Sequence, residues 1–485
     1  MNRVELHTHT TCSTDDGLIR IPDLLSFASQ NGMKAVAITD HGSIGGFSEA
    51  SQVVSEMKKQ QRLPDDFKMI YGVEAYLVDD LTGVVMRENG QSISDDVVVI
   101  DIETTGFSAE NDSIIEIGAI KLSDGQEVEN FYALVKPENE IPQYIEELTG
   151  ISNEMVQNQP SIEKILPQLI EFVGDCVVVG HNVKFDVSFL LINASRFGLT
   201  LEPTCVDTLP ISRLLFPHAA RFRLASVAEE LGIEYDNLHR VVDDARLTAQ
   251  IYLKLVDILK SRALNTWKEV NEKYIGNSNA VKRSLCYHAT ILAKDRNGLE
   301  NLQHIVEVSE ENYYYQRPRI PKSLLQKYRE GLLVGSACEA GELYSAVIDD
   351  KSEAECIELA KFYDYIELQP ISNNKFMCEN ERYRNIHNKD DLQRMNRLII
   401  EIGNKLGKPV VATSDAHYLR KEDSVKRVNL LQELGFEDVS DCQGLHIRTT
   451  KEMLHDFEYL GEKEAHRIVV ENTNKIADMI SNDIL

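Results

Sequence analysis

Five residues in the middle of the chain have the types and the spacing of a two-metal hydrolytic site. Asp101 and Glu103 lie two positions apart in a run that reads as a β-strand, so both carboxylates would point to the same face of a sheet. Asp186 and Asp244 each stand at the beginning of a helical pattern and bring the set to four carboxylates. Four carboxylates suit two Mg²⁺ or Mn²⁺ ions about 3.5–4 Å apart, which together would hold the attacking and leaving oxygens of a phosphodiester. His239, five residues before Asp244, would then act as the general base on the attacking water.

A second set of potential ligands stands on both sides of the first set in the sequence. His7 and His9 alternate along an expected strand, which places both imidazoles on one side. The other candidate ligands of this set are Asp40, His41, Glu74, Asp415 and His417. A single His-x-His pair or a lone cysteine is usually structural, and an Asp-x-Glu pair is usually solvated charge. The order of the complete sets, one nested inside the other, therefore carries more information than any single motif.

The elements that must position these residues alternate between short strands and helices. Apolar runs at residues 4–6, 34–39 and 69–78 predict strands, and between the first two a helix begins at Pro22-Asp23 and ends at Asn31-Gly32. Such alternation is typical of parallel strands covered by helices. Because the carboxyl ends of such strands converge on one face of a barrel, ligands that are distant in the sequence can share one site.

A polar, turn-rich stretch at residues 79–96 predicts a domain boundary. A new strand opens at Val97, the unit that follows ends with a helical pattern over residues 243–260, and residues 262–280 read as the linker that returns to the first domain. Buried-strand patterns then resume, and the last 60 residues are predicted to be mostly helical and polar. The resumed strands are expected at residues 287–292, 332–335, 365–368 and 409–413.

Length, composition and charge limit the classes of protein that the chain can represent. Its 485 residues, 43% of them hydrophobic, are enough for two or three buried cores. No run of about 18 apolar residues is present and the start lacks the apolar core of a secretory signal, so we expect a cytoplasmic protein without a membrane partner.

The eight cysteines of the chain form no Cys-x-x-Cys pair, which argues against a disulfide scaffold and a thiolate zinc cluster. A net charge of −27 opposes nonspecific adhesion to nucleic acid, so contact with DNA would be local and assisted by metal ions.

Four motifs around the central carboxylates closely resemble the DEDDh family of 3′ to 5′ exonucleases. They are Asp101-Ile102-Glu103-Thr104-Thr105-Gly106, Ile115 to Ala119, Gly180 to Asp186, and His239 to Asp244. The resemblance implies a ribonuclease-H-like fold over about residues 96–260, in which His239 is the base. The implied ligands of Mg²⁺ or Mn²⁺ are Asp101, Glu103, Asp186 and Asp244. The implied binding turn for the terminal nucleotide is Thr104, Thr105 and Gly106.

Two neighbours of these motifs are expected to play lesser parts. Phe185, next to Asp186, is expected to pack in the core rather than to stack on a base. Asp243, next to Asp244, lacks the family's spacing from His239, so it is expected to face solvent or to support the ligands from behind.

The surrounding residues occur in the order and local settings of the PHP family, the polymerase and histidinol phosphatase domains. The settings include Thr39-Asp40-His41-Gly42, Gly335-Ser336-Ala337-Cys338 and Ser414-Asp415-Ala416-His417. The resemblance implies a distorted, parallel barrel of the (β/α)7 type that carries up to three ions of Zn²⁺, Mn²⁺ or Fe²⁺. Hydroxide bound to these ions would attack a phosphate ester. The implied ligands are His7, His9, Asp16, His41, Glu74, His288, Cys338, Asp415 and His417.

An exonuclease inserted into a PHP domain is the arrangement of the PolC-type family of bacterial DNA polymerase III, which the chain resembles nearly from end to end. The expected domains are a PHP domain in two parts (residues 1–90 and 280–425), the exonuclease between them (residues 96–262), and a helical segment (residues 426–485) that resembles the start of the polymerase region. Compared with that family, the chain is expected to lack the amino-terminal oligonucleotide-binding domain and the polymerase core with its catalytic aspartates. We therefore expect no DNA synthesis.

The resemblance leads to one main hypothesis and two alternatives. The main hypothesis is a metal-dependent exodeoxyribonuclease that removes nucleotides from DNA 3′ ends, in single-stranded or frayed primers, and so proofreads during replication. The first alternative is that the outer site is itself a phosphoesterase or pyrophosphatase. The second is that the PHP portion is a structural module that docks the polymerase core or other replisome parts.

Two weaker signals concern binding partners. Residues 313–319, Tyr-Tyr-Tyr-Gln-Arg-Pro-Arg, interleave aromatic and basic side chains, which suits stacking and phosphate contact. A surface loop that packs its tyrosines on the barrel explains the same composition. Residues 432–436, Gln-Glu-Leu-Gly-Phe, loosely resemble a peptide that binds the sliding clamp, but Leu434 and Phe436 also suit the anchoring of a helix end.

Overall fold

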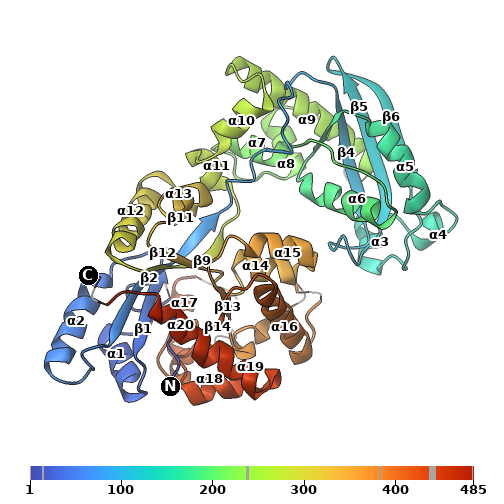
Figure 1. The fold of residues 1–485 in the computed structure, drawn as a ribbon. Coiled ribbons are helices and arrows are strands. Elements are labelled where there is room, and N and C mark those ends of the chain that lie inside the picture. Colours follow the sequence, from blue (N-terminus) through green and yellow to red (C-terminus); the bar gives the residue numbers. More distant parts are fainter. Residues whose placement is uncertain are drawn as a thin grey trace. The chain divides into compact units, whose positions relative to one another are not determined.

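The chain folds into two compact units. The computed structural model describes residues 2–13, 16–235, 240–380, 382–383, 385–435, 444–482 and 484–485 (Figure 1). The outer unit consists of Met1–Val78 together with Leu285–Leu485, and the inserted unit consists of Asp79–Ser284. The insertion therefore interrupts the outer unit directly after the strand that contains Glu74.

A closed circuit of strands forms the centre of the outer unit. Its strands are β1 (Ala35–His41), β2 (Lys68–Val78), β9 (Tyr287–Ala293), β12 (Leu332–Gly335), β13 (Ile366–Leu368) and β14 (Val410–Ala412). β1 pairs with β2, β2 with β9, β9 with β12, and β13 with β14. Three isolated bridges complete the circuit. Gly335–Tyr365 connects β12 to the residue directly before β13. Thr8–Ala416 and Glu5–Val36 connect the amino-terminal segment to the residues after β14 and to β1.

The strands run parallel, as predicted, with one exception. The pairs β1–β2 and β13–β14 are parallel, whereas β9 is antiparallel to both of its neighbours. The expected strand at residues 4–6 is present only as an isolated bridge. A hairpin of β10 (Tyr314–Tyr315) and β11 (Arg317–Pro321) is added beside β2, to which β11 is parallel.

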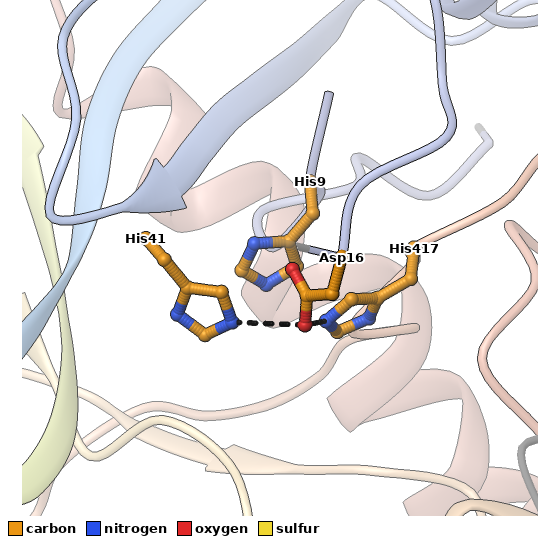
Figure 2. A group of neighbouring side chains, drawn as sticks. All are labelled: His9, Asp16, His41 and His417. Atoms are coloured by element: carbon orange, nitrogen blue, oxygen red, sulfur yellow. Dashed lines mark ion pairs between the residues drawn. The ribbon is translucent and has the colours of Figure 1, made fainter. Parts of the chain in front are cut away.

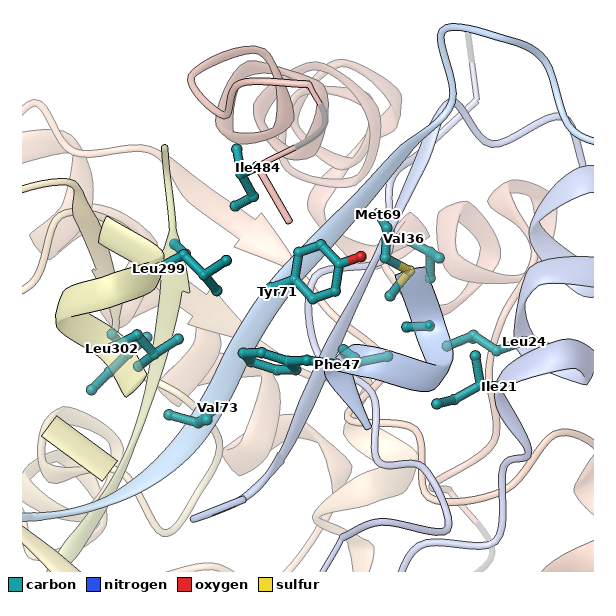
Figure 3. Packing of buried hydrophobic residues seen from close by; sticks show 14 of the residues in the cluster. Ile21, Leu24, Val36, Phe47, Met69, Tyr71, Val73, Leu299, Leu302 and Ile484 are labelled. Carbon is teal, nitrogen blue, oxygen red and sulfur yellow. The ribbon is translucent and has the colours of Figure 1, made fainter. Parts of the chain in front are cut away.

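Helices bury their apolar faces against this circuit. α1 (Ile21–Gln30) has a proline in its first turn and ends at Asn31, as predicted. Figure 3 shows Phe47 of α2 (Phe47–Lys59) beside Tyr71 of β2, with ring centroids 5.1 Å apart, and Leu299 and Leu302 of α12 (Arg296–Asn312) in the same core. Burial of one such side chain contributes about 1.5–3 kcal/mol. This core therefore fixes the strand ends that carry the candidate ligands. The following helices are α13 (Lys322–Lys327), α14 (Glu342–Ile348), α15 (Glu353–Ala360) and α16 (Lys389–Lys405).

The last 60 residues are helical over most of their described part, and several of their apolar side chains are buried in the outer unit. Their helices are α17 (Ser424–Glu433), α18 (Thr450–Asp456), α19 (Glu462–His466) and α20 (Asn472–Asp478). Phe457 and Ile468 are fully buried in the core around β13 and β14, and Ile476 and Ile480 pack in a cluster with Leu6. The segment thus completes the core of the outer unit.

The inserted unit is built on a mixed sheet with the strand order β3-β8-β7-β4-β5-β6. These strands are β3 (Val85–Met86), β4 (Val97–Thr104), β5 (Ile114–Ser123), β6 (Gln126–Leu134), β7 (Val177–Gly180) and β8 (Cys205–Asp207). β4 is parallel to β7 and antiparallel to β5. The mixed α/β class predicted for the chain is confirmed.

Helices follow the strands of the inserted unit and carry part of its candidate site. They include α3 (Gln143–Thr149), α4 (Asn153–Val156), α5 (Ile162–Val173), α6 (Lys184–Arg196), α7 (Thr208–Leu215), α8 (Leu224–Glu230) and α9 (Val241–Ser261). No helix of either unit, within the ranges described above, is long and apolar enough to cross a membrane.

Both stretches that read as linkers belong to the inserted unit. β3, which lies within residues 79–96, pairs with β8. Residues 262–280 largely form α10 (Trp267–Tyr274) and the beginning of α11 (Ser278–Arg283). Thr266 forms a capping box with Glu269 at the start of α10, and Trp267 is fully buried. The charged composition of this stretch masks the few apolar residues that anchor it.

α9 approaches the sheet closely at its first turn. A Cβ atom on Gly118 of β5 would lie 2.7 Å from the carbonyl carbon and oxygen of Val241, so only glycine allows this approach. The backbone N–H of Asp244 donates to the carbonyl of Arg240 at 2.9 Å and so begins the helix. The close approach places Asp244 beside β4 and β5.

Candidate active site and metal centre

Three of the four predicted carboxylates of the inserted unit meet at one point. Asp101 and Glu103 project from β4 and Asp244 from the first turn of α9, and one oxygen atom of each lies within 4.8 Å of the others. Asp186, in the first turn of α6, accepts a hydrogen bond from the backbone N–H of Ile102 at 3.1 Å, so it is bound to the same strand. The structure therefore gathers all four carboxylates around β4.

The charges of these carboxylates oppose one another in a buried place. Burial, followed by the charges of Asp186 and Asp244, raises the pKa of Asp101 well above its usual range. Burial, followed by Asp244 and Glu116, raises the pKa of Glu103 to about 7, and burial raises that of Asp186 to about 8. Such a set of hard oxygen ligands holds protons unless a cation compensates it, and Mg²⁺ or Mn²⁺ fits this donor set.

The two adjacent aspartates at the start of α9 differ in their surroundings. Asp244 is 8% exposed and belongs to the cluster, whereas the side chain of Asp243 is 57% exposed and pairs with Arg246 at 3.5 Å. The side chain of Asp243 therefore faces solvent, whereas that of Asp244 faces the cluster. His239 lies outside the described residues.

The turn after β4 is held together by its own side chains. The hydroxyl of Thr104 donates to the carbonyl of Gly106 at 2.6 Å, and the hydroxyl of Thr105 donates to Asp112 at 3.3 Å. A Cβ atom on Gly106 would lie 2.4 Å from the Asp112 carboxylate, so a larger residue there would displace that side chain. Phe185 packs on Phe189 with ring centroids 5.1 Å apart, in agreement with a packing role.

Glu116 is a buried carboxylate near the cluster to which the sequence pattern assigned no role. It lies on β5 directly opposite Glu103 and is 0% exposed. It accepts a hydrogen bond from the Tyr132 hydroxyl at 2.8 Å and one from Arg240 at 3.4 Å. This contact connects β5 to Arg240, the residue directly before α9. The signal for it is a single charge within the otherwise apolar run Ile114–Ile120.

All nine predicted ligands of the outer unit fall into overlapping groups whose ligand atoms lie within 4.8 Å of one another. Figure 2 shows one group, in which the carboxylate of Asp16 points between His41 and His417, at 3.5 and 3.0 Å. A tenth residue, Glu339, joins the set beside Cys338. The groups are His9, Asp16, His41 and His417; His7, His9, Glu74 and Asp415; His41, Glu74 and His288; and Cys338, Glu339 and Asp415.

Glu74 of β2 lies at the centre of this arrangement. Its carboxylate lies 2.9 Å from Nδ1 of His41, 3.0 Å from Nδ1 of His288 and 3.3 Å from Nε2 of His7. The thiol of Cys338 lies 3.4 Å from Nδ1 of His288 and 3.5 Å from Glu74. Residues from both sequence halves of the outer unit therefore form one cluster.

Burial and opposite charges perturb the imidazoles strongly. Burial, together with the charges of His417 and His41, lowers the pKa of His9 to about 3. For His41, burial acts in the same direction, but Glu74 and Asp16 outweigh it and raise the pKa to about 10. A donor set of imidazole, carboxylate and thiol atoms suits Zn²⁺, Mn²⁺ or Fe²⁺, which would replace these protons.

A buried carboxylate behind His7 is a second residue that the sequence pattern did not identify. Glu367 of β13 lies 2.9 Å from Nδ1 of His7 and also accepts a hydrogen bond from the Thr413 hydroxyl at 3.0 Å. This contact leaves Nε2 of His7 to face the cluster, which is the role of a group that orients a ligand. Asp40 is not in the cluster, because its carboxylate accepts from the backbone N–H of Thr10 at 2.6 Å.

The clamp-like sequence at residues 432–436 is described only in part. Leu434 follows α17 and is 48% exposed, so it does not anchor the end of that helix. Phe436 lies outside the described residues.

Comparison with protein families assigns a class to the inserted unit. Residues 98–252 match the family model described as exonuclease. The inserted unit therefore contains an exonuclease domain, and a domain of this kind depends on divalent metal ions, in keeping with the carboxylate cluster.

Nearly the whole chain is similar to bacterial proteins named DNA polymerase III PolC-type. It is 44% identical over 479 residues to that of Clostridium perfringens (strain 13 / Type A), which covers 99% of this chain and 32% of the relative. It is 42% identical over 480 residues to that of Caldanaerobacter subterraneus subsp. tengcongensis (99% and 34%) and 38% identical over 487 residues to that of Bacillus subtilis (strain 168) (99% and 33%). The chain thus spans about a third of the length of the curated relatives that it matches.

Among solved structures, the chain is similar to exonuclease X in complex with 5′ overhanging duplex DNA. That match has 23% identity and a TM-score of 0.30 and covers 37% of this chain and 99% of the other. A second match is the nuclease domain of 3′hExo, a DEDDh family member, bound to rAMP, with 20% identity, a TM-score of 0.30, and coverage of 36% and 95%.

Proposed function

We propose that the chain belongs to the PolC-type DNA polymerase III family and that its inserted unit is a metal-dependent 3′ to 5′ exonuclease that removes nucleotides from DNA 3′ ends. The observation that carries the proposal is the meeting of Asp101, Glu103 and Asp244 within the stretch that matches the exonuclease family. The fold of this unit would be ribonuclease-H-like, and the outer unit would be a PHP barrel.

The candidate residues of the inserted unit would have three roles: metal binding, proton transfer and binding of the terminal nucleotide. Asp101, Glu103, Asp186 and Asp244 would hold Mg²⁺ or Mn²⁺, which when bound supplies activated water and neutralises charge on the phosphate. His239 would take the proton of the attacking water. The turn at residues 104–106 would receive the terminal nucleotide.

The substrate would be a single-stranded or frayed DNA primer end, and the activity would proofread during replication. The names of the relatives support DNA rather than RNA and a place in a replicative polymerase. The net charge of −27 supports local contact at the metal site rather than broad adhesion to the nucleic acid. A polymerase core and a sliding clamp would be its partners.

Two neighbouring substitutions test this proposal in the full chain. Asp244→Asn removes a ligand and should lower the Mg²⁺-dependent exonuclease rate more than about 100-fold, because groups that only support ligands already contribute 10–100-fold. Asp243→Asn removes the same charge one residue away, outside the cluster, and should leave the rate within about threefold of wild type. Equal rates for the two variants would contradict the assignment.

A second candidate function is hydrolysis of a phosphate ester or pyrophosphate at the outer site. The gathering of nine ligand atoms favours it. Metal content after dialysis and hydrolysis of p-nitrophenyl phosphate and pyrophosphate should both fall in His7→Ala and Asp415→Ala. If metal removal lowers only stability or polymerase association, the outer unit is a docking module.

A further inference from the structure

The hairpin of β10 and β11 fixes one arginine at the edge of the outer cluster. Gln316 makes the turn with φ 61°, and Arg319 of β11 pairs with Tyr76 of β2. Pro318 packs on the loop after His41, where a Cβ atom on Gly42 would lie 2.6 Å from the proline ring. The hairpin is therefore held between the strand that carries Glu74 and the loop that follows His41.

Arg317 is exposed at the tip of this hairpin, yet its guanidinium is held in place. It lies 4.9 Å from the centroid of the Tyr76 ring, a cation–π contact that restricts the plane of the guanidinium. The same Tyr76 ring lies 5.7 Å from the ring of His41 and 5.4 Å from that of His288. A single aromatic ring thus separates the guanidinium from two candidate ligands.

His288 is also the most exposed of the nine predicted ligands. Its side chain is 18% exposed, compared with 14% for Asp16, whereas His7 and His9 are 0% exposed. His288 lies directly opposite Tyr76 in the β2–β9 pair. The most exposed of the predicted ligands therefore lies beside the Tyr76 ring on which Arg317 rests.

No carboxylate of the described residues neutralises the positive charge of Arg317. Other arginines of the outer unit pair with carboxylates, for example Arg3 with Glu5 at 2.7 Å and Arg427 with Asp16 at 3.1 Å. Among the described residues, Arg317 forms no ion pair with a carboxylate; its partner is the Tyr76 ring. Although the chain has a net charge of −27, a cation that no described carboxylate neutralises can bind an external anion.

We propose that Arg317 is the anion-binding residue of the outer site and holds the phosphate group of a phosphate ester beside the candidate metal cluster. The planar guanidinium can donate two parallel hydrogen bonds to phosphate oxygens, and the Tyr76 ring presets its orientation. The inference rests on the second candidate function for the class of substrate, but not on turnover, because binding of the anion can be measured without hydrolysis.

Inorganic phosphate is the probe that tests this inference, titrated calorimetrically into the Mn²⁺-loaded full chain. Arg317→Gln should weaken phosphate binding at least tenfold, and Arg317→Lys should recover part of the affinity because it keeps the charge but loses the fork of donors. The matched control is Arg382→Gln, which removes another arginine–tyrosine contact, 5.9 Å from the Tyr383 ring, and should bind phosphate as wild type does. Mn²⁺ content must equal that of wild type in all variants.

The possible outcomes distinguish failure of the anion site at Arg317 from failure of the phosphoesterase proposal. If phosphate affinity depends on Arg317 but no variant hydrolyses p-nitrophenyl phosphate, the anion site stands and the phosphoesterase proposal fails. If wild type hydrolyses this ester and Arg317→Gln does so with an unchanged KM, the inference is wrong and the phosphoesterase proposal stands. Equal phosphate affinity in wild type and Arg317→Gln, or no phosphate binding by the Mn²⁺-loaded wild type, also overturns it.

Discussion

Replacement of Glu103 by glutamine should stabilise the metal-free inserted unit and remove its activity. In the folded protein the pKa of Glu103 is raised from 4.5 to about 7 by burial and by the charges of Asp244 and Glu116. The unfolded chain ionises this group at the ordinary value. Between about pH 4.5 and 7 the folded state therefore binds more protons than the unfolded state, and wild type loses stability as pH rises through this window.

The size of the effect follows from this difference. About 2.5 pH units at 1.36 kcal/mol each correspond to about 3 kcal/mol of stability that wild type has lost at pH 8. Glutamine cannot ionise and keeps the shape of the side chain. Because neighbouring carboxylates can take over part of the proton binding, we expect Glu103→Gln to be more stable by about 1–3 kcal/mol at pH 8 and by little at pH 4.5.

Trp267 makes the measurement specific for the inserted unit. It is the single tryptophan of the chain and is fully buried in that unit, so its fluorescence during urea unfolding reports on that unit within the full chain. The comparison uses wild type and Glu103→Gln in EDTA at pH 4.5 and pH 8. Added Mg²⁺ should then stabilise wild type more than the variant, because the variant lacks a ligand.

Two results would refute this reasoning. If Glu103→Gln is no more stable than wild type at pH 8 in EDTA, the carboxylates do not repel one another as the structure indicates. If its advantage is as large at pH 4.5 as at pH 8, the effect arises from packing and not from charge.

Three further substitutions test the surroundings of the two candidate sites. Gly118→Ala places a Cβ atom against the backbone of Val241 and should lower both the urea midpoint and, more than tenfold, the exonuclease rate; unchanged values would contradict the close approach of α9. Arg240→Gln loosens the start of α9 and should lower kcat about tenfold with little change in Mg²⁺ affinity, whereas a large loss of affinity would argue against a positioning role. Glu367→Gln removes the partner of His7 and should weaken metal binding by the outer unit about 10–100-fold in equilibrium dialysis, and unchanged metal content would exclude that role.

The positions of the ligands follow from the sequence because they depend on local rules. Alternation places Asp101 and Glu103 on one face of β4, and converging strand ends bring His41 and Glu74 together from neighbouring strands. The order of the motifs also predicts that the insertion follows Glu74.

Features that depend on distant partners could not be predicted in this way. An apolar run does not reveal strand direction, so the sequence does not predict the antiparallel course of β9. Glu367 and Glu116 are buried charged residues that accept hydrogen bonds from Thr413 and Tyr132, which lie 46 and 16 residues away on other parts of the fold. The anchoring of α10 by Trp267 depends on a core assembled from the whole inserted unit.

The polarity of digestion tests the proposed exonuclease most directly. A DNA primer labelled at its 5′ end, annealed to a template with either a matched or a mispaired 3′ terminus, is incubated with the full chain and Mg²⁺. The proposal predicts a ladder that shortens from the 3′ end, runs faster on the mispaired primer, and disappears with EDTA and in Asp101→Asn. Release of the labelled 5′ nucleotide, internal cleavage, or wild-type digestion by Asp101→Asn would contradict it.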